Sequence, residues 1–111
     1  MEVKHQIRCF ESDVLVCEDG RSFTISIQAR TNPLGFGRAL GTFGKLERAL
    51  DAAEQFCLAY RIAREHGYYL KEDEFVRYGR RPIAVNWVLE RRFSEQEWND
   101  LIARRAKADA G

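Results

Sequence analysis

The densest cluster of basic side chains in this sequence lies in its C-terminal third, where three arginines surround one tyrosine. The stretch reads Arg77-Tyr78-Gly79-Arg80-Arg81, and two further arginines follow it, Arg91 and Arg92. Guanidinium groups bind phosphate through paired hydrogen bonds, and an aromatic ring can stack on an unstacked base. These residue types together favour contact with a nucleic-acid backbone and its bases. The cluster is therefore our first candidate binding site.

The same arginines have a second interpretation, which the sequence leaves open. Four carboxylates lie near them in the chain and could pair with them at the surface: Glu72, Asp73, Glu74 and Glu90. Such ion pairs lie on a solvated face and contribute little to stability. Three basic residues near the C-terminus either extend the basic patch or keep that end soluble: Arg104, Arg105 and Lys107.

A second candidate site is the turn-rich loop over residues 31–37. A proline and two glycines break regular structure there, and Leu34 and Phe36 stand between them. Apolar side chains in such a loop insert into a partner protein or fold back over the edge of the core. The glycine spacing fits neither a P-loop nor a dinucleotide-binding fingerprint. We therefore retain Leu34 and Phe36 as a partner-binding site.

Residues capable of catalysis or metal binding are present, but their spacing forms no known motif. The three cysteines, Cys9, Cys17 and Cys57, are widely separated, which indicates free thiols and argues against a zinc site. His5 and His66 are isolated, and no serine has the context of a nucleophile elbow. We therefore predict a non-catalytic protein with no metal and no cofactor. One thiol could still be sensitive to oxidation, and the sequence does not distinguish which.

Composition predicts a globular protein whose residues 1–111 form a single domain. Apolar residues make up 45% of the chain and charged residues 32%, which is ordinary for a protein with its own core. A net charge of +1 argues against indiscriminate nucleic-acid binding, although a local basic face remains compatible with it. Because the apolar runs are short and the N-terminus lacks the features of a secretory signal, we expect a cytoplasmic protein without a membrane partner.

The elements that position these residues begin with an antiparallel meander. Alternation and β-branched runs predict strands over residues 3–10, 14–17 and 22–29. Asp19-Gly20 predicts a tight hairpin with a type I′ turn between the second and third strands. A short strand over residues 38–43 is expected to close the sheet.

A long helix and one further strand are predicted after the meander. Apolar residues at three- and four-residue spacing predict the helix over residues 44–66, with Gly67 in position to end it. Alternating apolar residues predict a strand over residues 83–89: Ile83, Val85, Trp87 and Leu89. The predicted fold class is therefore α+β: an antiparallel sheet of four to six strands packed on one long helix, with a shorter C-terminal helix.

The C-terminal helix has a clear sequence signal at its start. Ser94 can accept a hydrogen bond from the backbone of Glu97 while the Glu97 side chain reaches back, which is a capping box. Phe93 and Trp98 occupy the two positions of a hydrophobic staple. These signals predict a helix over residues 95–107.

One stretch of the chain also follows the pattern of a known family. Phe23-Thr24-Ile25-Ser26-Ile27 forms the last long strand, Leu40-Gly41-Thr42-Phe43 follows the loop, and then come Glu47, Ala49 and Ala52. From about residue 23 to residue 67 the chain thus resembles the AP2 domain and the arm-type DNA-binding domain of phage and transposon integrases. In that family the sheet face away from the helix reads the DNA major groove. The resemblance implies a DNA-facing set of six residues: Ser22, Thr24, Ser26, Gln28, Arg30 and Arg38.

The sequence therefore predicts a small binding module, with two classes of partner left open. The first class is nucleic acid, DNA above all, bound through eight residues: Arg77, Tyr78, Arg80, Arg81, Arg91, Arg92, Arg30 and Arg38. The second class is a protein. In that case the chain would be a small inhibitor or adaptor of a phage or mobile element and would bind its partner through Leu34 and Phe36. The sequence does not indicate an oligomeric state.

Overall fold

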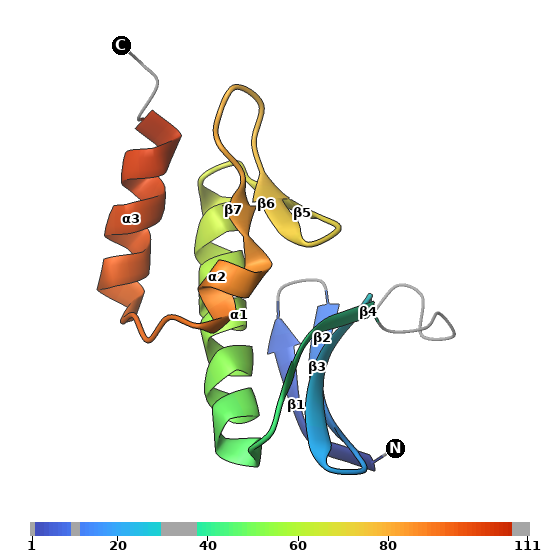
Figure 1. Cartoon of the computed structure of the whole chain (residues 1–111). Coiled ribbons are helices and arrows are strands. Elements are labelled where there is room, and N and C mark those ends of the chain that lie inside the picture. The colour runs from blue at the N-terminus through green and yellow to red at the C-terminus, as the bar shows by residue number, and fades with distance from the viewer. Residues whose placement is uncertain (1, 10–11, 30–37, 108–111) are drawn as a thin grey trace.

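The computed structural model describes residues 2–9, 12–29 and 38–107, and its first four strands form an antiparallel sheet in chain order (Figure 1). The strands are β1 (Glu2–Cys9), β2 (Ser12–Asp19), β3 (Ser22–Ala29) and β4 (Arg38–Phe43). Helix α1 (Leu46–Glu65) follows and packs across one face of this sheet. The predicted meander and long helix are therefore confirmed.

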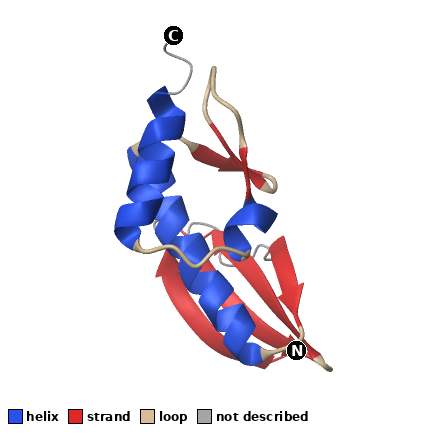
Figure 2. Cartoon of the chain, turned by 60° about the vertical axis from the view of Figure 1, so that its left-hand side comes forward, coloured by secondary structure: helices blue, strands red, loops and turns tan. Residues whose placement is uncertain are grey.

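The rest of the described chain forms a second, smaller group of elements. Three short strands make an antiparallel sheet: β5 (Tyr69–Lys71), β6 (Glu74–Val76) and β7 (Ile83–Ala84). Two helices follow, α2 (Val85–Leu89) and α3 (Glu95–Lys107), and both pack on α1 (Figure 2). The α+β fold class, with one long helix and a shorter C-terminal one, is confirmed. No helix in the described part of the chain is long and apolar enough to cross a membrane.

One part of the core lies between the first sheet and α1, and the rest lies between α1 and the elements that follow it. Val14 and Val16 of β2 and Ile25 of β3 are fully buried beneath the helix. The buried positions of α1 are mostly alanine, which lets the helix backbone approach its neighbouring elements closely: Ala49, Ala52, Ala53, Ala59 and Ala63. Phe56 fills the remaining space and stacks on Phe75 of β6, so one core serves both groups of elements.

The turn between β2 and β3 differs by one residue from its predicted position. Asp19 pairs with Ser22, which leaves Gly20 and Arg21 as the two-residue turn. Gly20 has a φ of 65°, and Glu72 is the one non-glycine residue with positive φ in the described ranges. A glycine at the first turn position is typical of type II′, so the predicted type I′ turn at Asp19-Gly20 is wrong.

The region after α1 holds the largest differences from the predicted elements. The strand predicted over residues 83–89 is wrong, since only Ile83–Ala84 is extended and Val85–Leu89 forms α2. A helical turn lets Val85, Val88 and Leu89 all face the core, and all three are buried. The hairpin of β5 and β6 was not predicted, because its two-residue turn contains no glycine.

The start of α3 has the predicted capping box and hydrophobic staple. The Glu97 backbone N–H donates to Ser94 Oγ, and the Ser94 N–H donates to Glu97 Oε1, each at 3.1 Å. The Phe93 and Trp98 rings lie 4.9 Å apart between centroids. Trp98 is fully buried, and its indole N–H donates to Gln55 Oε1 of α1 at 2.7 Å. The helix is thus fixed to α1 at its first turn.

Candidate nucleic-acid interface

The loop between β6 and β7 presents an aromatic ring to solvent. Tyr78 is 100% exposed, and it precedes Gly79, whose φ of 74° turns the chain. The Arg80 backbone N–H donates to the Arg77 carbonyl at 3.0 Å and closes the turn. Arg77 is half-buried and lies over Gly67, where a Cβ would come within 3.4 Å of its Nε. The loop is therefore anchored at its base, while Tyr78 at its tip is exposed to solvent.

Arg80 holds this loop against the end of α3. Its Nε donates to the Ala106 carbonyl at 2.6 Å, and its Nη1 donates to the Gly79 carbonyl at 3.0 Å. The carbonyl end of a helix carries a partial negative charge, so a guanidinium is stabilising there. Arg80 therefore serves mainly to position the loop.

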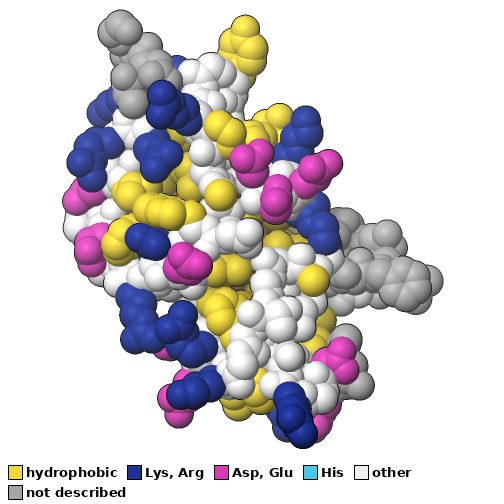
Figure 3. Space-filling view, in the orientation of Figure 1, with side chains coloured by type: hydrophobic (Ala, Val, Ile, Leu, Met, Phe, Trp, Pro, Cys, Tyr) yellow, Lys and Arg dark blue, Asp and Glu magenta, His cyan; other side chains and the backbone are white. Residues whose placement is uncertain are grey.

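The contact made by Arg80 brings two basic segments of the chain together. The last turn of α3 carries Arg104, Arg105 and Lys107, and residues 101–107 contain no acidic side chain. Lys and Arg side chains gather over the C-terminal part of α3 in Figure 3, whereas acidic side chains at the upper right of that view lie toward the β5–β6 hairpin. We call the four exposed side chains of this region the loop–helix surface: Tyr78, Arg81, Arg104 and Lys107.

Nearby carboxylates pair with only some of the arginines in the predicted basic cluster. Arg91 Nη2 lies 3.7 Å from Glu90 Oε2. Within the described ranges, Arg77, Arg80 and Arg81 form no ion pair with the three acidic residues at positions 72–74. The positive charges of the loop are therefore not neutralised by direct contact with those residues.

Arg91 and Arg92 lie away from the loop tip and have partners of their own. The Arg91 guanidinium lies 4.7 Å from the Trp87 ring centroid, and Arg105 approaches the same ring at 5.8 Å. These are cation–π contacts on the outer side of the aromatic cluster formed with α3. Arg92 Nη2 lies 3.6 Å from Asp51 Oδ2 of α1. Arg91 therefore packs on Trp87 of α2, whereas the exposed Arg92 pairs with α1 at the surface.

Of the remaining predicted site residues, only Arg38 lies in the described part of the chain. Arg38 begins β4, and its Nη2 donates to the Glu72 carbonyl in the β5–β6 turn, so it connects the two sheets. Arg30 and the loop residues Leu34 and Phe36 lie outside the described residues. The structure therefore groups Arg77, Tyr78, Arg80 and Arg81 but does not bring Arg38 to them.

The polar face of β3 lies on the side of the sheet away from α1. Ile25 is buried toward the helix, so its neighbours Thr24 and Ser26 point to the opposite face. Thr24 pairs with Thr42 of β4, and their hydroxyl oxygens lie 3.4 Å apart. In the described part of the chain no helix packs on this face. The β3 side chains on this face are uncharged: Ser22, Thr24, Ser26 and Gln28.

Two features of the site were not predictable from neighbouring residues in the sequence. The bond from Arg80 to Ala106 joins residues 26 positions apart, and no local pattern indicates it. The sequence indicates Arg105 only as one of several basic residues near Lys107, whereas its contact with Trp87 depends on how α2 and α3 lie in the fold. No protein-family model, curated protein or solved structure matches this chain. A functional assignment therefore depends on the side chains of the loop–helix surface.

Proposed function

We propose that this chain is a small, non-catalytic nucleic-acid-binding module of the cytoplasm that contacts single-stranded segments, DNA above all, through the loop–helix surface. The observation that supports it most is Tyr78, which is 100% exposed on an anchored turn between basic side chains. A tyrosine that packs against nothing contributes little to the fold. It is, however, well placed to stack on an unpaired base.

The charges around Tyr78 complement a sugar–phosphate backbone. Arg81 lies three residues after the tyrosine, and Arg104 and Lys107 come from the last turn of α3. Arginine binds phosphate through its planar fork of donors, while lysine acts as a point charge. A strand whose base stacks on Tyr78 would place its flanking phosphates among these side chains.

The modest charge of the whole chain limits the expected affinity. With a net charge of +1, the protein lacks the general basic excess that produces tight unspecific binding. We expect a dissociation constant on the order of 10⁻⁶ M at low salt, weakening toward about 10⁻⁴ M at physiological salt. Single strands should bind more tightly than duplex, because paired bases cannot stack on the tyrosine.

Fluorescence anisotropy with a labelled single-stranded DNA of roughly 15 nucleotides tests this proposal, since that length covers a small domain. We expect a saturable rise in anisotropy and weaker competition by unlabelled duplex than by unlabelled single strand. Equal competition by the two would contradict the stacking role of Tyr78. No rise even at low salt would contradict nucleic-acid binding and favour the protein-interaction alternative.

A further inference from the structure

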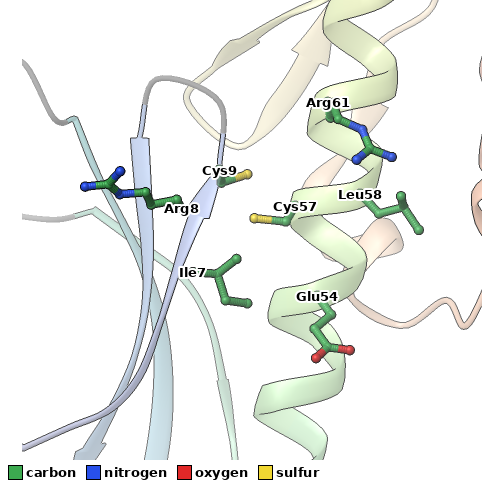
Figure 4. Close-up of a pocket in the computed structure, with 7 residues that line it drawn as sticks. All are labelled: Ile7, Arg8, Cys9, Glu54, Cys57, Leu58 and Arg61. Atoms are coloured by element: carbon green, nitrogen blue, oxygen red, sulfur yellow. The ribbon is translucent and has the colours of Figure 1, made fainter.

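Two cysteines that lie far apart in the sequence face each other in the structure. Cys9 ends β1 and Cys57 lies in the middle of α1, and their sulfur atoms point toward one another across a pocket (Figure 4). Both cysteines line this pocket. Ile7 and Leu58 line the apolar part of this pocket, which has a volume of about 370 Å³. The packing of the sheet on α1 therefore creates a dithiol.

The two thiols differ in their access to solvent. Cys9 is 3% exposed, whereas Cys57 is only half-buried and lines an open pocket. The neighbouring Cys57 thiol and burial raise the pKa of the Cys9 thiol, and the Arg61 guanidinium acts in the opposite direction. Because a thiol attacks as its thiolate, Cys9 is a poor first nucleophile. Cys57 is therefore the residue that an external reagent reaches first.

The charge near the pocket suggests the kind of reagent that would enter. Arg61 lies four residues after Cys57, one helical turn away, and lines the same pocket. Its guanidinium also pairs with Glu95 of α3 at 2.8 Å, which holds it in place. The lining also includes Arg8 and Glu54, so two cations and one carboxylate border the pocket. This net positive lining favours an anionic small molecule over a neutral one.

We propose that Cys9 and Cys57 form a redox modification site, in which an anionic low-molecular-weight disulfide converts the dithiol reversibly into an intramolecular disulfide. The Cys57 thiolate attacks the small disulfide, which forms a mixed disulfide and releases one small thiolate. Cys9 then loses its proton to solvent, attacks the Cys57 sulfur and displaces the second small thiolate. Two electrons pass from the protein thiols to the reagent, and the small thiolates are protonated by water.

The position of β1 makes this crosslink structurally feasible. Among the described strands β1 is an edge strand that pairs only with β2, and its register shifts between Val3 and His5. An edge strand can adjust so that two facing cysteines reach disulfide geometry. The new bond would fasten the edge of the sheet to α1 and restrict the unfolded chain.

Cys17 provides an internal control in the same molecule. It is buried on β2 and pairs with Val3 and Thr24. Strand alternation places it on the sheet face opposite to that of Cys9, since Cys9 pairs with Ser12. It can neither reach Cys57 nor meet the reagent in the folded protein.

The test is incubation of the folded protein with glutathione disulfide, followed by intact mass measurement and peptide mapping. We expect the loss of two hydrogen atoms in mass, a Cys9–Cys57 crosslinked peptide and a free Cys17. The oxidised protein should also show a higher denaturant midpoint, and dithiothreitol should restore the starting mass and midpoint. Three unmodified thiols, or a lasting glutathione adduct without a crosslink, would overturn the proposal.

Single serine variants separate the role of Cys57, which attacks first, from that of Cys9, which attacks second. Cys9→Ser should stop at a stable glutathione adduct on Cys57, while Cys57→Ser should form no adduct. Cys17→Ser should crosslink as the parent protein does, and each variant is first checked for a parent-like circular dichroism spectrum. An adduct on Cys9 in the Cys57→Ser protein would contradict the assigned order of attack.

Discussion

Replacing Trp98 by alanine should lower the free energy of unfolding by about 3–5 kcal/mol. The side chain is fully buried and packs edge-on against two rings, at 4.9 Å from Phe93 and 6.0 Å from Trp87. Its indole N–H also donates to Gln55 of α1. The substitution therefore removes a large apolar surface, leaves a cavity and breaks the link between α3 and α1.

Urea denaturation followed by far-ultraviolet circular dichroism measures this loss without relying on tryptophan fluorescence. Trp98→Phe is a suitable control, because it keeps an aromatic ring. The side-chain oxygen Oε1 of Gln55 still accepts a hydrogen bond from the Phe93 backbone N–H at 3.0 Å. We expect its loss to be less than half that of the alanine variant. A loss below about 1 kcal/mol for Trp98→Ala would show that α3 is not anchored through this residue.

Replacing Tyr78 by alanine should weaken single-stranded DNA binding by about 5- to 150-fold, because stacking on one base contributes about 1–3 kcal/mol. The ring is 100% exposed, so the free energy of unfolding should change by less than about 0.5 kcal/mol. This combination separates a binding role from a structural one. The affinity is measured by anisotropy and the stability by urea denaturation on the same preparations.

Tyr78→Phe is the matched control, since it keeps the ring and removes only the hydroxyl group. We expect its affinity to stay within about twofold of the parent protein, as stacking depends on the ring face. If both variants lost the same affinity, the hydroxyl would be the binding group and the stacking role would be wrong. If neither lost affinity, Tyr78 would lie outside the interface.

The elements that the sequence predicted well are those with local signals. Ser94 and Glu97 define the start of α3 through bonds between near neighbours, and these bonds are present. Gly67 ends α1 with a φ of 86°, as its position after a helical run indicated. Strand β3 was predicted because strict alternation over eight residues fits only an extended chain.

The elements that the sequence predicted poorly are short and depend on tertiary packing. Val85 to Leu89 alternates like a strand, but burial of Val85, Val88 and Leu89 together requires a helical turn. The β5–β6 hairpin turns through Glu72, whose φ of 55° is unusual for a residue with a side chain. Neither feature has a strong local pattern.

In the candidate site, too, the sequence predicted the features that neighbouring residues determine and missed those that depend on tertiary packing. The loop sequence around Tyr78 was identified from composition, because arginines interleaved with an aromatic residue are visible in the chain itself. The contact of Arg80 with α3 depends on the final packing of distant elements. The approach of Cys9 to Cys57 likewise depends on how the sheet lies on α1, which spacing along the chain does not indicate.

The salt dependence of single-stranded DNA binding tests the proposed interface most directly. The informative variant replaces three exposed cations of the loop–helix surface by glutamine: Arg81, Arg104 and Lys107. Arg80 is left intact, because its bond to the Ala106 carbonyl holds the loop. A control variant makes the same charge change at exposed cations near the β2–β3 turn and the start of α1: Arg21, Lys45 and Arg48.

Each phosphate contact that is lost should reduce the slope of log affinity against log salt concentration by about 0.7 for a single strand. We therefore predict a shallower slope and weaker binding for the loop–helix variant, with the control variant close to the parent protein. Equal slopes for the parent protein and the loop–helix variant would contradict the proposed interface. A larger change in the control variant would place the binding surface at the other end of the molecule.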